Sequence, residues 1–580
     1  MSQRPNTESA RPPGAAKTDL RGGRNSGLWL AFVVFAVAVG GYLSLPSRRY
    51  NPDGLRVFFG LHEVKADSAG EVTFVPLGWA TGYQAPHYFR ANVQKHFLFP
   101  LYAFAGYRIA RWFGWSGSGL RPLQIMNAMA AALAIGLFGL LGWQLLAGRL
   151  LVLVLSLGLA CSAAFGAMVA NIAEVVPALP GLMLGLVVLA RRDEPDLRAA
   201  LLAGLLLGVS AGFYLVTGAI GLTLAVWLAL RRRPWSGLLM FGTLAGVVLV
   251  IYLGVLLAAG CRSLPQLAHA LFFMPEQGTY GGLKATNLVT VWLGFANSVF
   301  PVLPDDFSGL RGLFGAGGSG WRFYSRVVIL PLVIVLSVGL FAALVRARRQ
   351  ITGPARRRVG LGLAVFLGAL GASLVWDPYH PKFWVFSNVG LWLMTAGYVA
   401  HIRTARRAGK VATRVLPAEI LLALGLFTVV SINLARRIID AGPNPHETAS
   451  RAIARQVNAR PGSIVLGGWE YEFDYLALLV PESNQLCLPD AILEQRRDPS
   501  RVRNLLGVAL DTTRTQGGQV LVLNQFNRTP DELRAFYARR LKFPDFPDWL
   551  ETRRSSAQPI WQDSLTGNVL YALAGLEPPE

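Results

Sequence analysis

Long apolar segments alternate with short polar segments over most of this 580-residue chain. As helices, these segments approach or exceed the length needed to cross a hydrocarbon core of about 30 Å. The pattern therefore predicts a polytopic α-helical membrane protein with about 11 transmembrane helices. The predicted spans are residues 27–45, 122–147, 150–168, 175–190, 199–213, 214–230, 236–259, 327–345, 359–376, 383–401 and 416–435.

Two further apolar segments are predicted to lie at the membrane without crossing it. Residues 97–115 contain Pro100 and combine many aromatic side chains with Arg108 and Arg111, as a helix lying in the interface does. Residues 289–302 are predicted to be interfacial or re-entrant, because a full crossing there would invert every span that follows.

The charge of the chain reports its orientation in the membrane. Hydrophobic residues make up 53% of the chain and charged residues 15%, which excludes an ordinary soluble enzyme. The net charge of +22 first suggests nucleic acid, but the arginines lie in short runs between the spans, such as 231–233, 346–349 and 356–358. Such runs mark cytoplasmic loops. We therefore predict no nucleic-acid partner, a cytoplasmic amino terminus and an external carboxyl terminus.

The chain becomes polar after about residue 441. Helical patterns over 447–459 and 501–513 alternate with strand patterns over 463–466 and 519–523, and Thr529 opens a further helix. This alternation is typical of an α/β domain. The predicted organisation is a disordered cytoplasmic tail (1–26), a transmembrane domain (27–441) with an external loop (46–121), and an external α/β domain (442–580).

Most titratable side chains other than arginine fall on the external face in this topology, and Asp53 is the leading candidate among them. It follows the first span in the segment 51–54, Asn-Pro-Asp-Gly. Close to lipid, the pKa of this carboxyl is expected to rise, so that it can act as a base toward a hydroxyl group. The same four residues are also an ideal turn sequence, and the pattern alone leaves both interpretations open.

Two other places combine charge with apolar surroundings. Glu174 lies in the short link between the third and fourth spans, where a carboxylate is either functional or simply reaches the external interface. The hairpin 376–384 contains His380 and Lys382, and a cation there is placed either to bind a phosphate or to anchor the helix at the interface. A second group of candidate phosphate ligands precedes the interfacial helix: Arg90, Lys95 and His96.

Taken together, these segments resemble the GT-C superfamily of integral membrane glycosyltransferases, which includes protein mannosyltransferases and aminoarabinose transferases. The resemblance rests on residues 51–54, on His96 to Tyr102 at the entry to the interfacial helix, on Arg121-Pro122, and on the hairpin 376–384. In layout it covers roughly residues 27–435.

The resemblance implies an inverting hexosyl or pentosyl transferase in the plasma (inner) membrane of a bacterium. Its donor is a sugar carried on a polyprenyl phosphate, its acceptor (protein, lipid or glycan) is external, and Asp53 matches the catalytic base. Many members have an adjacent pair of acids where this chain has one, so no cofactor is certain and a divalent cation is the one candidate. The expected substrate-binding residues are Arg90, Lys95, His96, Glu174, His380 and Lys382.

Two other classes of function compete with this one. A polytopic transporter or flippase would suit the number of spans, but transporters usually have ionisable residues at mid-membrane and repeated halves. This sequence has few charges inside its spans and no evident repeat. A non-catalytic membrane scaffold is the second alternative, and it leaves the external acids and histidines unexplained.

Overall fold

The computed structural model describes the following residues, with a few single residues between them: 20–44, 64–66, 72–74, 98–114, 120–145, 149–170, 173–191, 195–258, 285–299, 353–375, 381–407, 445–468, 484–494, 498–541 and 546–573. Most of the described residues before 410 are helical, and those after 445 form an α/β unit.

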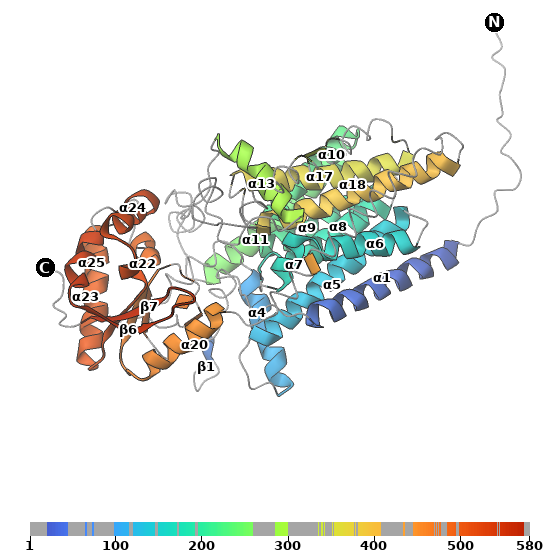
Figure 1. Ribbon diagram of the computed structural model, residues 1–580. Helices are drawn as coiled ribbons and strands as arrows, with labels where there is room; N and C mark the ends of the chain where they lie inside the picture. The colour runs from blue at the N-terminus through green and yellow to red at the C-terminus, as the bar shows by residue number, and fades with distance from the viewer. Residues whose placement is uncertain are drawn as a thin grey trace, which may run out of the picture.

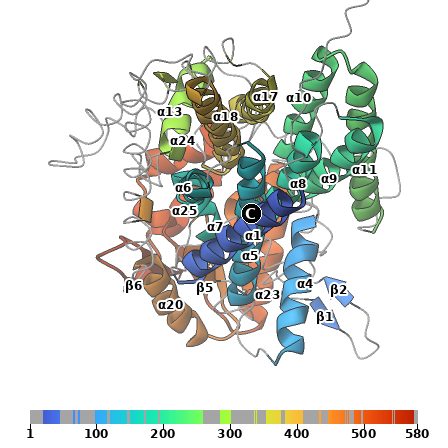
Figure 2. The same ribbon diagram turned by 90° about the vertical axis from the view of Figure 1, so that its right-hand side faces the viewer.

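A bundle of apolar helices makes up the first part of the structure (Figure 1). Figure 2 shows α9, α10 and α11 on one side of this bundle and α13, α17 and α18 on another. The pairs α17 with α18, α9 with α11, and α1 with α5 pack along each other. The helices are α1 (Leu20–Ser44), α4 (Leu98–Trp112), α5 (Leu120–Leu145), α6 (Arg149–Ala160), α7 (Ala163–Ala170), α8 (Ala178–Arg191), α9 (Leu197–Phe213), α10 (Val216–Leu230), α11 (Pro234–Ala258), α13 (Asn287–Val299), α17 (Gly353–Val375) and α18 (Pro381–Arg407).

The protein is a polytopic helical membrane protein. Within the described residues, five helices are long and apolar enough to cross a membrane, or six if α6 and α7 are counted as one broken span. The predicted spans at 175–190, 199–213 and 214–230 correspond to α8, α9 and α10, which are shorter apolar helices. The predicted total of about 11 spans stays a prediction, because the spans at 327–345 and 416–435 lie almost entirely outside the described residues.

Two helices differ from their predicted form. The segment predicted as one span over 150–168 is broken in the structure, because α6 and α7 meet at a bend of 65°. The backbone turns at residues 161–162, where Ser162 donates its hydroxyl to the carbonyl oxygen of Leu159 at 2.9 Å and so caps the end of α6 locally. The first helix begins at Leu20 instead of residue 27, because extending a helix already formed costs far less than starting one.

Both segments predicted to lie at the membrane without crossing it are helical. In α4 one side packs on the bundle through Phe99, which is fully buried, while Trp112 is 86% exposed. The helix α13 packs against α7, α17 and α18, and Phe295 at its centre is buried. Their position relative to lipid stays a prediction.

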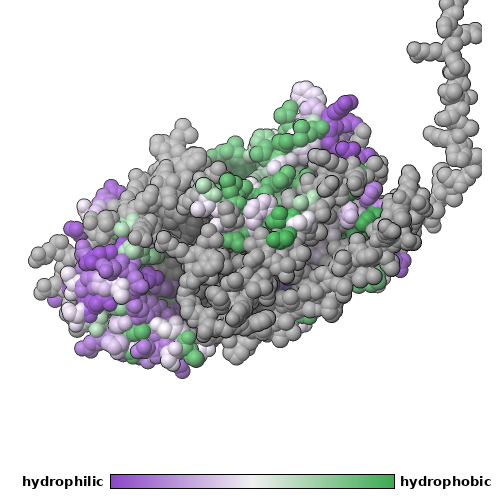
Figure 3. Space-filling view, turned by 45° about the horizontal axis from the view of Figure 1, so that its top comes forward, coloured by the Kyte–Doolittle hydropathy of each residue, from purple (hydrophilic) through white to green (hydrophobic). Residues whose placement is uncertain are grey.

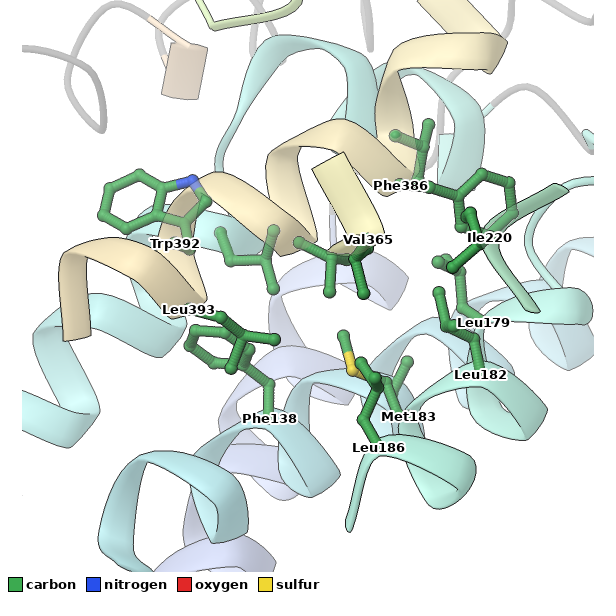
Figure 4. Packing of buried hydrophobic residues seen from close by; sticks show 14 of the residues in the cluster. Phe138, Leu179, Leu182, Met183, Leu186, Ile220, Val365, Phe386, Trp392 and Leu393 are labelled. Carbon is green, nitrogen blue, oxygen red and sulfur yellow. The ribbon is translucent and has the colours of Figure 1, made fainter. Parts of the chain in front are cut away.

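A single apolar core joins most of the bundle. Figure 4 shows side chains from α5, α8, α10, α17 and α18 meeting there, among them Phe138, Leu182 and Trp392. Close helix contacts depend on glycine in places. A Cβ on Gly390 of α18 would lie 2.6 Å from the carbonyl oxygen of Gly362 on α17, so only hydrogen at this position allows the two backbones to approach.

The α/β unit contains a five-stranded sheet in the order β4-β3-β5-β7-β6. Strands β4, β3 and β5 are parallel, and β7 pairs antiparallel with both β5 and β6. The strands are β3 (Ile464–Gly467), β4 (Asn484–Cys487), β5 (Val520–Leu523), β6 (Ala557–Gln562) and β7 (Val569–Leu573). The helices are α20 (Pro445–Asn458), α22 (Leu488–Glu494), α23 (Pro499–Thr515), α24 (Pro530–Arg540) and α25 (Phe546–Arg554), and a short helix η3 (Gln525–Asn527) follows β5.

Alternation along β5 assigns its two faces to different helices. Val520 and Val522 pack with the core that includes α22, α23 and α24, whereas Leu521 and Leu523 pack with α20. Both faces are therefore covered, which explains why this strand is apolar at every position. The start predicted at Thr529 is confirmed: its side chain and that of Glu532 form a capping box at the beginning of α24.

The α/β unit lies beyond one end of the helical bundle (Figure 1). Hydrophilic side chains gather over this unit in Figure 3, while hydrophobic ones gather over the bundle. The separate two-stranded sheet of β1 (Val64–Ala66) and β2 (Val72–Phe74) falls within the predicted loop 46–121. That the α/β unit is soluble and external stays a prediction.

Candidate functional site

A buried ion pair joins two of the residues selected from the sequence. The Nζ of Lys382 lies 3.2 Å from Oε1 of Glu174, and the two residues are 208 positions apart in the chain. Glu174 is fully buried and Lys382 is 8% exposed. Both side chains therefore point into the protein, and the choice between a functional role and a place at the membrane interface stays a prediction.

Glu174 is held by the turn that connects α7 to α8. On one side of this turn, the side-chain amide of Asn127 on α5 donates to the carbonyl oxygen of Ala173 at 3.2 Å. On the other side, the hydroxyl of Ser210 on α9 donates to the carbonyl oxygen of Ala178 at 2.6 Å. Bonds from two helices, α5 and α9, thus fix the short segment that carries the carboxylate.

Lys382 is the second residue of α18, and the first turn of this helix is fixed by neighbouring contacts. The indole of Trp384 donates to the carbonyl oxygen of Pro378 at 2.8 Å and packs on Phe295 of α13. A Cβ on Gly294 of α13 would lie 1.8 Å from that same carbonyl oxygen. The backbone at Pro378 can therefore approach α13 so closely only because residue 294 is glycine.

Aromatic rings surround the ammonium end of this pair. The Nζ of Lys382 lies 5.6 Å from the ring centroid of Phe383, a distance at which a cation and a ring attract each other. Tyr214, at the end of α9, contacts Phe383 and Phe386 with centroid distances of 6.0 and 5.9 Å. Both charged side chains are buried, and low exposure to water strengthens the attraction between them.

The pair lies at the end of the bundle opposite the arginine runs. Helix α18 has Lys382 of the ion pair at its start and Arg407 at its end, so the ion pair and the arginine lie at opposite ends of the helix. At the far end of the bundle, Arg358 near the start of α17 donates to the carbonyl oxygen of Gln144 near the end of α5. Under the positive-inside rule the arginines are predicted to be cytoplasmic, and this prediction places the ion pair toward the external side.

Removing one partner of a buried pair costs about 3–5 kcal/mol, because an uncompensated charge is left behind. Apolar side chains of similar size would stabilise the helices at least as well as the pair does. The ammonium also lies in the first turn of a long helix, where the backbone dipole disfavours a cation and favours an anion. Chemically, this is a place that accepts an anionic group.

The other five residues selected from the sequence are Asp53, Arg90, Lys95, His96 and His380, and all of them lie outside the described residues. Their roles stay predictions. Four residues that position the pair were not selected from the sequence: Asn127, Ser210, Tyr214 and Gly294. Each of them looks like an ordinary residue of an apolar helix or its end, so nothing in the local pattern distinguishes them.

No group of three or more His, Cys, Asp or Glu side chains that could hold a metal ion occurs among the described residues. The ion pair contributes one carboxylate, already bonded to a cation. The candidate divalent cation therefore stays a prediction that depends on residues around Asp53.

A second polar cluster lies in the α/β unit. Glu472, which is buried, accepts hydrogen bonds from Asn568 at 2.7 Å and pairs with Nδ1 of His446, in the first turn of α20. Burial pushes the pKa of Glu472 upward, but the bonds from His446, from its own backbone and from Asn568 outweigh burial and leave the pKa below its ordinary value. The cluster ties α20 to the loop before β7.

No protein-family model matches the sequence, and no curated protein matches it. Among solved structures, the chain is similar to ArnT from Cupriavidus metallidurans bound to undecaprenyl phosphate, at 15% identity over 95% of this chain and 98% of that chain, with a TM-score of 0.44. The apo state of the same protein gives 15% identity over 94% and 98%, with a TM-score of 0.46. An oligosaccharyltransferase from Archaeoglobus fulgidus, in a complex with Zn and sulfate, gives 13% identity over 94% and 73%, with a TM-score of 0.44. These similarities are too loose to transfer a site or an activity.

Proposed function

We propose that this protein is an inverting glycosyltransferase that moves a sugar from a polyprenyl-phosphate donor to an acceptor on the external side of the membrane. Asp53 is the general base, and Lys382 binds the donor phosphate. The donor sugar is a hexose or a pentose. The proposal rests on the motifs shared with the GT-C superfamily and on the geometry around Lys382.

The observation that carries the proposal is the buried ammonium of Lys382 in the first turn of α18. A lipid-linked donor brings a phosphate to the membrane boundary, and a cation there in dry, aromatic surroundings binds a phosphate strongly. The exposed apolar side chains of α4, among them Leu101, Ile109 and Trp112, support the same function, because such a helix can guide a polyprenyl chain toward the site.

The reaction needs one proton acceptor and one anion stabiliser. Asp53 takes the proton from the acceptor hydroxyl, and the acceptor oxygen forms a new bond to the anomeric carbon. The bond from that carbon to the phosphate oxygen breaks, and the polyprenyl phosphate leaves with the bonding electrons. Negative charge then develops on the phosphate, where the ammonium of Lys382 lowers the energy of the transition state.

The test uses the full chain reconstituted in lipid nanodiscs with a panel of polyprenyl-phosphate sugars and follows release of the lipid phosphate. We expect Asp53→Asn to lower transfer by at least about 100-fold, the scale of losing a general base. Asp67→Asn in the same predicted loop is the matched control and should retain transfer. Full activity of Asp53→Asn with correct expression would remove Asp53 from the mechanism.

The same nanodiscs separate the enzyme from a flippase. A flippase would move an intact polyprenyl-phosphate sugar between leaflets without releasing its phosphate. Translocation of a fluorescent donor in vesicles, with no phosphate release for any donor and acceptor, would contradict the proposed function.

A further inference from the structure

We propose that Glu174 is an internal anion that occupies the place of the donor phosphate, and that the donor must displace it from Lys382 in order to bind. This inference rests on the proposed function, because it describes regulation of the same site. Glu174 is then a positioning residue that acts through Lys382 and does not touch the reacting atoms.

The charge balance at Lys382 disfavours a second anion beside the ion pair. Its ammonium is 8% exposed and has the carboxylate of Glu174 at 3.2 Å. A phosphate bound to Lys382 beside the intact pair would lie close to the carboxylate of Glu174, and two like charges at such a distance repel each other. Exchange of one anion for the other keeps the balance.

Glu174 lies in a turn, whereas Lys382 lies in a helix. Residues 174–177 form a turn, and α8 starts only at Ala178. Lys382, by contrast, is anchored within α18, whose first turn is fixed by the bond from Trp384 to Pro378. When an anion competes for the ammonium, the movement that leaves both the helices and the fixed turn intact is therefore a rotation of the Glu174 side chain.

The exchange of anions also affects release of the product lipid. When the sugar has been transferred, the polyprenyl phosphate remains at Lys382 and has to leave. Return of Glu174 to the ammonium displaces the spent lipid phosphate and restores the neutral pair. Glu174 thus weakens the binding of the lipid phosphate and speeds its release.

The test measures binding of undecaprenyl phosphate to the full chain in nanodiscs, with undecaprenol as the probe that lacks the phosphate. We expect Glu174→Gln, which keeps the size and removes the charge, to bind undecaprenyl phosphate about tenfold more tightly than the wild type and to release it more slowly. Affinity for undecaprenol should be unchanged. Unchanged or weaker binding of the phosphate by a folded Glu174→Gln variant would overturn the inference.

Two further variants test the role of the cation. Lys382→Met removes the cation and should lose the difference in affinity between the two lipids. The double variant Glu174→Gln, Lys382→Met removes both charges together, so it guards against misfolding, and it should bind both lipids equally. If Glu174→Gln fails to fold, the wild type is titrated with inorganic phosphate while it binds undecaprenyl phosphate. Preferred binding of undecaprenyl phosphate over undecaprenol, with no competition from inorganic phosphate, would overturn the inference.

The binding readout is independent of sugar transfer. Should no sugar be transferred while Glu174→Gln tightens lipid-phosphate binding, the proposed function fails and the anion exchange stands. Should transfer occur while Glu174→Gln leaves phosphate binding unchanged, the anion exchange fails and the proposed function stands.

Discussion

At the scale of single residues, two of the carboxylates that the structure describes are buried and compensated in different ways. Glu174 is paired with an ammonium inside the helical bundle. Glu472 lies in the α/β unit and is compensated by an imidazole and an amide, from His446 and Asn568. A buried carboxylate without such partners would be unstable in its charged form. The first pair faces a predicted substrate, whereas the second connects elements of the fold.

The position of Glu472 predicts a dependence of stability on pH. Its pKa in the folded protein lies below the ordinary 4.5, so its charged form stabilises the α/β unit above about pH 4.5, and this contribution is lost as the pH falls through the folded pKa. We expect Glu472→Gln to lower the free energy of unfolding by about 1–3 kcal/mol at pH 7, the scale of losing a buried charged hydrogen-bond acceptor.

Thermal unfolding of the full chain between pH 7 and pH 3, followed by near-UV circular dichroism, tests this. The difference between wild type and Glu472→Gln should shrink below about pH 4.5. Asp511→Asn, which changes an exposed carboxylate on α23, is the control and should show little difference at any pH. A constant difference between wild type and Glu472→Gln over the whole range would contradict the assignment.

At the scale of elements, the position of the candidate site depends on how closely helices approach. The start of α18 sits against α13 through Trp384 and the hairpin residue Pro378, and Gly294 supplies the space. The bend of 65° between α6 and α7 has a related effect, because it sets the direction in which α7 leads into the link that carries Glu174. Local helix signals do not report either feature.

Gly294 therefore connects helix packing with donor binding. We expect Gly294→Ala to push the hairpin away from α13 and to destabilise the protein by about 1–3 kcal/mol, as overpacking does. Because the hairpin precedes Lys382 directly, binding of undecaprenyl phosphate should weaken as well. Gly371→Ala on α17, where an added Cβ meets nothing within 4 Å, is the matched control. Wild-type melting and lipid-phosphate binding in Gly294→Ala would show that the close approach is not required.

At the scale of the whole molecule, charge and hydropathy divide the protein in two. The bundle has apolar surfaces and arginines at one end, and the α/β unit beyond its other end is hydrophilic (Figures 1 and 3). In the predicted topology, the α/β unit and the end of the bundle at which α18 begins share the external side of the membrane. The acceptor would then approach from the side of the α/β unit.

This layout predicts the sidedness of the chain. A reporter that is active only outside the cytoplasm should be active when fused after Glu580 and inactive when fused after Arg233, which follows α10 in a predicted cytoplasmic loop. Cell fractionation with both fusions, supported by protease accessibility, gives the measurement. A cytoplasmic signal from the fusion after Glu580 would mean that the number of crossings differs by one from the prediction.

The sequence by itself determined the features that depend on neighbouring residues. Apolar length set most of the helices, the arginine runs set the predicted orientation, and the alternation of short patterns located α20, β3, α23 and β5 within a few residues. Charge beside apolar segments also identified Glu174 and Lys382 as candidates, because a charge in such a place is costly wherever it occurs.

Only the tertiary structure decided that these two side chains meet. Their pairing joins positions 208 residues apart and follows from the packing of α5, α7, α9, α13 and α18 around them. Such packing depends on the shapes of many side chains at once, including the absence of a Cβ at Gly294. No local pattern encodes it, since the hydrophobic effect drives helices together without direction and close packing then selects their neighbours.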